Sequence, residues 1–220
     1  MIIGALVTAA GSGSRLGAPK QFLTLGPSER LVDRAVTTVA AVASWTGVIL
    51  PARHSWDGPT VDAVVTGGDS RYASIEAGLA VVPPEIDIVV VHSASHPLAS
   101  IELIHRVVGA VASGADGAVP FLEAVDVVKR HSDQGTLTTV GREGLGSAQC
   151  PMAFARPMLE RAFAETDDGT EESELVERIG GRVVAVAGDV ANLHVVDLAS
   201  LHLARTLAAA DISSPVAPPV

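Results

Sequence analysis

The sequence predicts an α/β fold, in the form of a Rossmann-like three-layer α/β/α domain with a mainly parallel sheet and a protruding β-hairpin arm. Short apolar runs alternate with longer segments of helical periodicity, which is the order of strands joined by crossover helices. Hydrophobic residues make up 48% of the chain but aromatic residues only 3%, so the core is built mainly from Val, Ala, Leu and Ile. Such a composition suits buried parallel strands covered by alanine-rich helices.

The first half of the chain supplies the regular part of this fold. Its short apolar runs are bounded by turn-forming residues, as strands are, and the segments between them have the periodicity of helices. The expected strands cover residues 2–9, 47–50, 61–65, 86–92 and 117–119, and the expected helices cover residues 29–43, 70–82 and 100–112. The connection between the second and third strands is too short for the usual intervening helix. A chain of 220 residues suits one domain, expected at 1–210.

Residues 121–147 break this rhythm. They alternate around the polar turn Asp133-Gln134-Gly135, which indicates a β-hairpin arm projecting from the sheet. An exposed hairpin has two faces to cover, and a partner subunit is a reasonable cover for one of them. The later patterns predict helices at 157–164 and 173–179, a strand at 182–186, a closing helix at 198–210 and a disordered tail at 211–220.

Charge and composition exclude several classes of protein. The formal net charge of −10 argues against non-specific binding to nucleic acid or to an anionic membrane, so an anionic substrate needs a local cluster of Lys and Arg. Cys150 is the single cysteine, which excludes an internal disulfide and a zinc knuckle. No apolar run reaches the roughly 18 residues that span a bilayer. The opening residues 1–4 lack the basic region of a signal peptide, and a cytoplasmic location is therefore expected.

A glycine-rich loop, residues 9–21, directly follows the first expected strand. Glycines let the backbone curl so that successive N–H groups face a phosphate, and Arg15 and Lys20 would add positive charge to a triphosphate cradle. The alternative is a tight turn with solvated basic residues. The spacing G-x-G-x-x-x-G differs from the dinucleotide fingerprint, and the Gly-Lys-Ser/Thr of a Walker A loop is absent.

A second glycine motif, Gly67-Gly68-Asp69-Ser70, lies between the third expected strand and its helix. Asp69 or Ser70 can cap that helix, whose first-turn amides favour an anion or the polar edge of a base. A capped helix without any ligand is the simpler interpretation of these residues alone.

The end of the fourth expected strand carries His92 and His96. Ligands bind beyond the carboxyl ends of strands in open parallel sheets, so this loop should border the site. A metal pair is disfavoured, because histidines four residues apart converge on a metal when they lie on a helix, and this is a loop before Pro97. The cations of the arm, such as Arg142, and the late His194 are, taken singly, more typical of a solvated surface.

Taken together, these motifs resemble the 2-C-methyl-D-erythritol 4-phosphate cytidylyltransferase family, over residues 2 to 207 or so. The most specific pieces are Ala9-Ala10-Gly11 with Arg15 and Pro19-Lys20-Gln21, and Gly67-Gly68-Asp69 with Arg71 and Ser74. The resemblance implies a glycosyltransferase-A-like nucleotidyltransferase fold. It also implies transfer of CMP from CTP to a sugar-alcohol phosphate with Mg²⁺, release of pyrophosphate, and a homodimer interlocked through the hairpin arm.

The resemblance also implies roles for individual residues, with no metal ligand among them. The implied catalytic residues are Arg15, Lys20 and His194, the implied nucleotide-binding residues are Ala9, Ala10, Gly11, Ser12, Gly13, Gly68, Asp69, Ser74 and Ser93, and the implied acceptor-binding residues are Arg142, His96, Thr170 and Val127.

Several positions depart from the family pattern, mostly where the acceptor and the metal should lie. Ser93 stands for an aspartate, His96 for an arginine, Val127 for a threonine, Met152 for a glutamine and His194 for a lysine. Replacing Asp by Ser removes a charge and a strong metal ligand, and replacing Lys by His leaves a group that is mostly neutral at pH 7. Each lost charge-assisted hydrogen bond is worth roughly 1.5–3 kcal/mol.

Three functions remain open at this point. The first is a functional cytidylyltransferase of the family, the second a nucleotidyltransferase with a different phosphorylated acceptor. The third is a nucleotide-binding paralogue with impaired catalysis that acts as a regulator or dimer partner. The residues that discriminate among them are Ser93, Val127, Met152 and His194.

Overall fold

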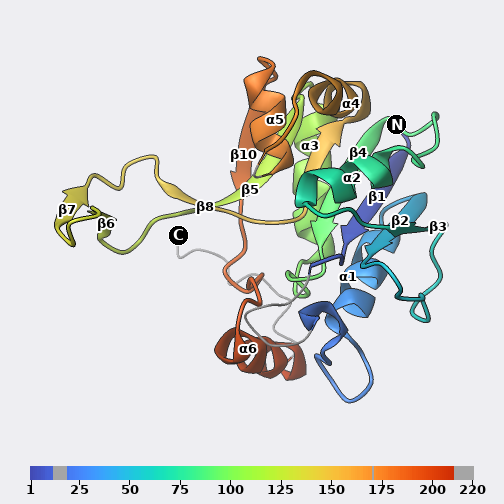
Figure 1. Cartoon of the computed structure of the whole chain (residues 1–220), viewed down its shortest axis with the longest axis horizontal. Helices are drawn as coiled ribbons and strands as arrows, with labels where there is room; N and C mark the ends of the chain where they lie inside the picture. Colours follow the sequence, from blue (N-terminus) through green and yellow to red (C-terminus); the bar gives the residue numbers. More distant parts are fainter. Residues whose placement is uncertain (12–18, 170, 211–220) are drawn as a thin grey trace.

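A mixed β-sheet lies between two layers of helices in the computed structural model, which describes residues 1–11, 19–169 and 171–210 (Figure 1). The strands are β1 (Ile3–Thr8), β2 (Trp45–Leu50), β3 (Ala63–Thr66), β4 (Ile88–Ser93), β5 (Gly117–Glu123), β6 (Val128–His131), β7 (Leu137–Val140), β8 (Gly146–Ala148), β9 (Met152–Ala155) and β10 (Val183–Ala187). The helices are η2 (Lys20–Phe22, a 3-10 turn), α1 (Leu31–Ala40), α2 (Arg71–Leu79), α3 (Ile101–Ala112), α4 (Arg156–Glu165), α5 (Glu172–Arg178) and α6 (Leu198–Ala209). The predicted fold class is confirmed.

The main sheet has the strand order β10-β5-β9-β4-β1-β2-β3, with β8 paired to β5. The pairs among β1, β2, β3 and β4, and the pair of β5 with β10, are parallel. β9 was not predicted, and it runs antiparallel between β4 and β5. Its four apolar residues follow a proline and lead directly into α4, so no alternation or turn marks them in the sequence.

The two faces of the sheet are covered by different helices. On one face Val36 of α1 and Val107 of α3 belong to one buried cluster, together with Val7 of β1. On the other face Ile75 of α2 and Leu159 of α4 pack with Leu6 of β1. Neighbouring residues of one strand thus belong to opposite cores, as the alternation of side chains along a strand requires.

α6 covers a third, smaller core that reaches the start of α1. Leu201 of α6 is buried with Leu25, Leu31 and Val195. This cluster holds the segment before α6 against the loop that carries η2. Two parts of the chain far apart in sequence are therefore adjacent beyond the carboxyl ends of the central strands (Figure 1).

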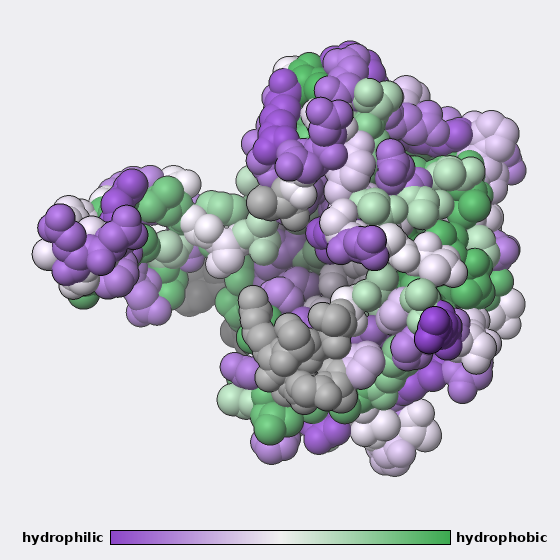
Figure 2. All heavy atoms as spheres, viewed as in Figure 1, coloured by the Kyte–Doolittle hydropathy of each residue, from purple (hydrophilic) through white to green (hydrophobic). Residues whose placement is uncertain are grey.

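The arm projects from the body of the molecule, as predicted (Figures 1 and 2). Its tip is a separate two-stranded sheet in which β6 pairs antiparallel with β7 around Gly135, whose φ is +78°. The base of the expected hairpin belongs to the main sheet, because β5 continues to Glu123 and pairs with β8. The expected tail, 211–220, lies outside the described residues.

No helix within the described ranges is both long and apolar enough to cross a membrane.

Candidate active site

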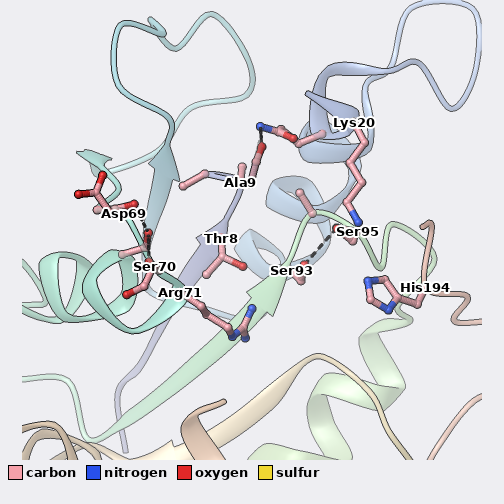
Figure 3. Close-up of a pocket in the computed structure, with 15 residues that line it drawn as sticks. Thr8, Ala9, Lys20, Asp69, Ser70, Arg71, Ser93, Ser95 and His194 are labelled. Carbon is pink, nitrogen blue, oxygen red and sulfur yellow. Dashed lines mark hydrogen bonds between the residues drawn. The ribbon is translucent and has the colours of Figure 1, made fainter. Parts of the chain in front are cut away.

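A cavity of about 420 Å³ opens beyond the carboxyl ends of β1, β3 and β4 (Figure 3). This is the position at which open parallel sheets bind their ligands. The strand ends, the start of α2, η2 and the segment before α6 each contribute to its wall. The lining residues are Thr8, Ala9, Ala10, Gly11, Lys20, Gln21, Gly68, Asp69, Ser70, Arg71, Ser74, Ser93, Ala94, Ser95 and His194.

Lys20 lies on one wall, opposite Asp69 and Ser70 (Figure 3). Its Nζ donates a hydrogen bond to the carbonyl oxygen of Val195 at 2.9 Å, which holds the ammonium beside His194. The neighbouring Gln21 is buried, and its Nε2 donates to the Gly11 carbonyl oxygen at 3.0 Å. The two ends of the glycine loop are thereby tied together.

The predicted phosphate-binding loop is described only in part. Ala9, Ala10 and Gly11 line the cavity, whereas Ser12, Gly13 and Arg15 lie outside the described residues. The roles expected of those three residues stay predictions.

The wall opposite Lys20 is built by the second glycine motif. A Cβ on Gly67 would lie 2.5 Å from the Cβ of Ala10, and a Cβ on Gly68 would lie 2.6 Å from that of Ala73. Gly67 is therefore required by the close approach of the first and third strand ends, and Gly68 by the close approach of the loop to the first turn of α2. Ser70 is the helix cap, since its Oγ accepts from the Ala73 N–H at 3.0 Å.

Ser74 and Asp69 complete that wall. Ser74 is buried and its Oγ donates to the Ser70 carbonyl oxygen at 2.8 Å, so the side chain is held in place by the first turn of α2. Asp69 is exposed in the cavity mouth and is the single carboxylate among the described lining residues. Ser74 and Asp69 thus give this wall hydrogen-bonding groups and one negative charge.

Two histidine rings stack at the edge of the cavity. The ring centroids of His96 and His194 lie 4.5 Å apart with an angle of 19° between the planes. His194 lines the cavity, whereas His96 is buried behind it and its Nδ1 has no hydrogen-bond partner within the described ranges. Burial lowers the pKa of His96 to about 2, and the nearby His194, His92, Lys20 and Arg71 act in the same direction. A ring with so low a pKa is neutral at pH 7.

His92 lies near His96 but is not part of the stack of His96 on His194. It lies in β4 with no exposed surface, and neither ring nitrogen has a hydrogen-bond partner among the described residues. Burial lowers its pKa to about 4. No group of three or more His, Cys, Asp or Glu side chains in the described part of the chain is placed to hold a metal ion.

An ion pair that the sequence did not reveal joins α2 to α5 at the cavity. The Arg71 guanidinium donates through Nε and Nη2 to the two carboxylate oxygens of Glu172, at 2.9 and 2.8 Å, across 101 residues of sequence. Arg71 lines the cavity, and Glu172 is buried behind it. Burial raises the pKa of the adjacent Cys150 to about 11, which keeps its thiol protonated at neutral pH.

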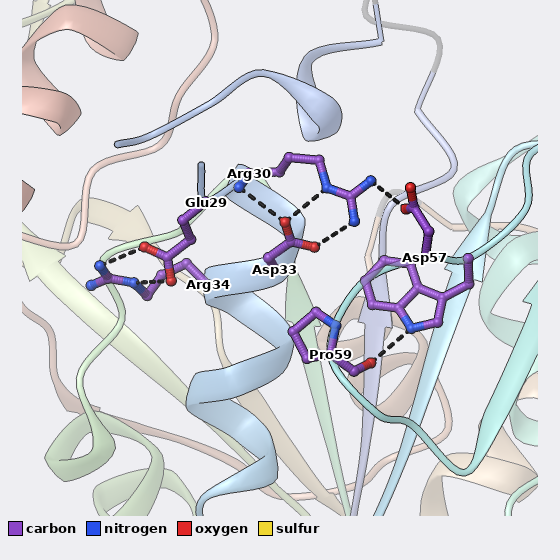
Figure 4. A network of polar contacts seen from close by, with 7 residues as sticks. Glu29, Arg30, Asp33, Arg34, Asp57 and Pro59 are labelled. Carbon is purple, nitrogen blue, oxygen red and sulfur yellow. Dashed lines mark hydrogen bonds and ion pairs between the residues drawn. The ribbon is translucent and has the colours of Figure 1, made fainter. Parts of the chain in front are cut away.

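A second polar network supports the turn that carries Lys20 (Figure 4). Arg30 donates through Nε and Nη2 to Asp33, both at 2.8 Å, and through Nη1 to Asp57 at 2.6 Å. Its guanidinium carbon lies 5.9 Å from the ring centre of Phe22 and 5.6 Å from that of Trp56. The start of α1 is thereby clamped between η2 and the connection from β2 to β3.

The predicted acceptor-binding residues are dispersed in the single chain. His96 lies next to the cavity, but Arg142 and Val127 lie on the exposed arm and do not line it. Arg142 Nη1 donates to the Val125 carbonyl oxygen within the arm. Thr170 lies outside the described residues.

Sequence reasoning assigned no role to several lining residues, among them Thr8, Gln21, Ser95 and Arg71. Thr8 and Ser95 lie at or near strand ends and Gln21 lies within the first glycine motif, so these positions were the available signal. Nothing local in the sequence signals the pairing of Arg71 with Glu172.

Comparisons with known proteins agree with one another. The model of the family described as IspD, 2-C-methyl-D-erythritol 4-phosphate cytidylyltransferase, matches residues 3–209. A protein of that name from Chromobacterium violaceum is 37% identical over 94% of this chain and 97% of its own length. Another from Streptomyces avermitilis is 36% identical over 84% of this chain and 82% of its own. The crystal structure of the Thermus thermophilus protein of that name superposes with a TM-score of 0.83 at 27% identity, covering 95% of this chain and 100% of its own.

Proposed function

The chain belongs to the 2-C-methyl-D-erythritol 4-phosphate cytidylyltransferase family, and from this premise we propose that its cavity transfers CMP from CTP to that sugar phosphate. Pyrophosphate is the second product. The chain is thus a nucleotidyltransferase of the non-mevalonate route to isoprenoid precursors.

The reaction exchanges one phosphorus–oxygen bond for another. A phosphate oxygen of the acceptor attacks the α-phosphorus of CTP in line, and the bond from that phosphorus to the bridging oxygen breaks, leaving its electron pair on pyrophosphate. Such transfers depend mainly on positioning and on stabilising the charge that develops on the phosphate groups. Lys20 offers a fixed positive charge on the cavity wall, and the amides of Ala10 and Gly11 lie at the same strand end.

The observation that carries the proposal is the meeting of two glycine motifs around one cavity. Gly11 and Lys20 come from the first motif and Gly68, Asp69 and Ser74 from the second, and they line opposite walls. This arrangement suits a ligand with an anionic end beside the ammonium and a polar base beside the start of α2. Ser93, expected to bind the nucleotide, and His194, expected to be catalytic, border the same space.

Membership of the family supports a requirement for Mg²⁺, whereas the described side chains do not group into a metal site. Asp69 is the one carboxylate that the described residues contribute to the wall. These residues do not form a site that would hold a divalent cation on their own. Mg²⁺ must therefore be supplied with the substrates in the assay.

Release of pyrophosphate tests the proposal directly. The protein is mixed with CTP, 2-C-methyl-D-erythritol 4-phosphate and Mg²⁺, and pyrophosphate is followed by a coupled assay. Release that requires both substrates is expected. Tight binding of CTP without release would instead indicate a nucleotide-binding paralogue.

A different phosphorylated acceptor is the second candidate, and the identity of two wall residues favours testing it. Ser93 and His194 line the cavity where the family pattern has an aspartate and a lysine. The same assay with a panel of other sugar-alcohol phosphates distinguishes the candidates, because the true acceptor has the highest kcat/KM.

We also propose a homodimer formed through the arm. The arm exposes Val125, Val127 and Leu137, whose exposed fractions are 79%, 70% and 63%. Burial of apolar side chains on a narrow projection stabilises the dimer when a second copy covers them.

We also propose a cytoplasmic location, which the sequence predicts.

A further inference from the structure

We propose that Arg71 is a further substrate-binding residue, which donates to a phosphate group in the cavity, and that Glu172 is the positioning residue that aims it. The inference rests on the proposed function, since it concerns the same cavity. It assigns a task to two residues on different helices, and no local motif indicates that they pair.

The two side chains of the ion pair differ in exposure: Glu172 is buried, and Arg71 is partly exposed. Glu172 begins α5, and 2% of its side chain is exposed. Arg71 begins α2, and 32% of its side chain is exposed, on the cavity wall (Figure 3). The carboxylate therefore has no access to a ligand, whereas the guanidinium does.

The hydrogen bonds to Glu172 hold one edge of the guanidinium, and 32% of the Arg71 side chain stays exposed. Its Nε and Nη2 are used by Glu172, in the two-pronged arrangement that fixes the plane of the group. The Cys150 thiol is a further side-chain partner of the guanidinium, and the part of the group that Glu172 and Cys150 leave uncovered lines the cavity. A planar group held at one edge presents its remaining N–H bonds in a fixed direction, as recognition of a phosphate requires.

Charge gives a reason for a phosphate in particular. The chain carries a net charge of −10, so an anion must be bound by local cations. Among the described lining residues, Lys20 and Arg71 are the side chains with a fixed positive charge. They belong to different walls, so a polyphosphate between them would meet a cation on two sides.

A purely structural ion pair is the alternative. Removing one partner of a buried pair leaves an uncompensated buried charge and destabilises the fold, whatever the function. The test must therefore keep the charges matched. Three variants do so: Arg71→Lys keeps the cation, Glu172→Asp keeps the anion, and the double variant Arg71→Gln with Glu172→Gln removes both charges together.

The measurements are the Kd of CTP by calorimetry and the split between KM and kcat in the pyrophosphate assay. Arg71→Lys and the double variant should each weaken CTP binding about tenfold or more, because a charge-assisted hydrogen bond is lost. Glu172→Asp keeps the charge but withdraws the carboxylate by one methylene, and about threefold or greater weakening is expected because the guanidinium is no longer aimed.

Glu174→Asp is the matched control. Glu174 lies on the same helix and pairs with the exposed Arg178, so CTP binding should stay within about twofold of wild type. Thermal unfolding establishes that each variant is folded. If Arg71→Lys does not fold, the CTP affinity of the double variant tests the role of Arg71 instead.

The outcomes separate the two proposals. Wild-type protein that binds CTP while Arg71→Lys and the double variant bind it equally well would overturn the role of Arg71 and leave the proposed function intact. A Glu172→Asp variant with unchanged CTP affinity would overturn the positioning role of Glu172. Failure of wild-type protein to bind CTP would overturn the proposed function and this inference with it.

Discussion

At the scale of single residues, the cavity combines side chains that the motifs marked with others that only the fold brings together. Lys20, Asp69, Ser74 and Ser93 were predicted from their places beside glycine motifs and strand ends, and all of them line the cavity. Arg71 was quoted as part of a motif, but its partner Glu172 lies 101 residues away. Local sequence carries no information about such a contact, because it depends on how α5 packs.

Lys20→Ala should weaken CTP binding. The fixed ammonium on the cavity wall is removed, and we expect a loss of about tenfold or more in affinity, measured by calorimetry. Arg161→Ala is the control, because it removes the same charge from the exposed surface of α4. Equal CTP affinity in Lys20→Ala and wild type would remove this residue from the site.

The buried histidines should make the protein sensitive to acid. Burial lowers the pKa values of His92 and His96, to about 4 and about 2, whereas unfolded histidine titrates near 6.5. Below pH 6.5 the unfolded chain therefore binds more protons than the folded one, so stability is full above that pH and falls as the pH falls. Each ring contributes up to about 1.4 kcal/mol per pH unit until its folded pKa is reached.

His92→Leu tests this linkage without touching the cavity wall. Urea unfolding at pH 7.5, 6.0 and 5.0 should give a shallower loss of stability than in wild type. His105→Gln is the control, because that ring is exposed on α3. An identical pH dependence in His92→Leu and wild type would show that His92 is not the source of the acid sensitivity.

At the scale of elements, regular strands and helices could be predicted and unusual ones could not. The parallel strands β1, β2 and β4 and the helices α1, α2 and α3 lie within the expected ranges or overlap them closely, because their apolar periodicity is strong. β9 was missed because four apolar residues between a proline and a helix show no period. η2 was missed because a 3-10 turn has no periodicity of its own.

Arg30→Gln should loosen the elements that carry Lys20. Arg30 joins α1 to Asp57 and stacks over Phe22, and its side chain is 21% exposed. We expect a loss of about 2 kcal/mol in the free energy of unfolding, since several charge-assisted hydrogen bonds disappear. For a domain of this size that corresponds to a fall of about 4–8 °C in Tm.

Arg34→Gln is the matched control on the same helix. Arg34 pairs with Glu29, and more than a third of each side chain is exposed, 39% and 34% respectively. A pair so open to water is worth less than about 1 kcal/mol. Equal losses of Tm in the two variants would contradict the account of the Arg30 clamp.

At the scale of the whole molecule, the alternation of strand and helix patterns predicted the layered architecture. The order of the strands in the sheet could not be predicted. The strand order depends on pairings between distant segments, such as β5 with β10, for which the sequence offers no local sign. The arm was predicted from one polar turn within alternating residues. Its base is shared with the main sheet, because β5 runs without interruption from that sheet into the arm.

The proposed dimer is tested at this scale. Replacing Val125 and Leu137 by Glu places charges on the exposed apolar surface of the arm, and the dimer should dissociate to monomer by sedimentation. Val190→Glu is a control on an exposed apolar residue of the body, and it should leave the sedimentation unchanged. A dimer that persists in the double arm variant would place the interface elsewhere.

A crystal structure with CTP and Mg²⁺ tests most directly the claim that one cavity binds the nucleotide. We predict density for CTP in the cavity at the ends of β1 and β4, with the triphosphate within hydrogen-bond distance of Lys20 Nζ and the cytosine beside Gly68 and Ser74. An empty cavity with CTP bound elsewhere would contradict the account. So would a triphosphate directed away from Lys20.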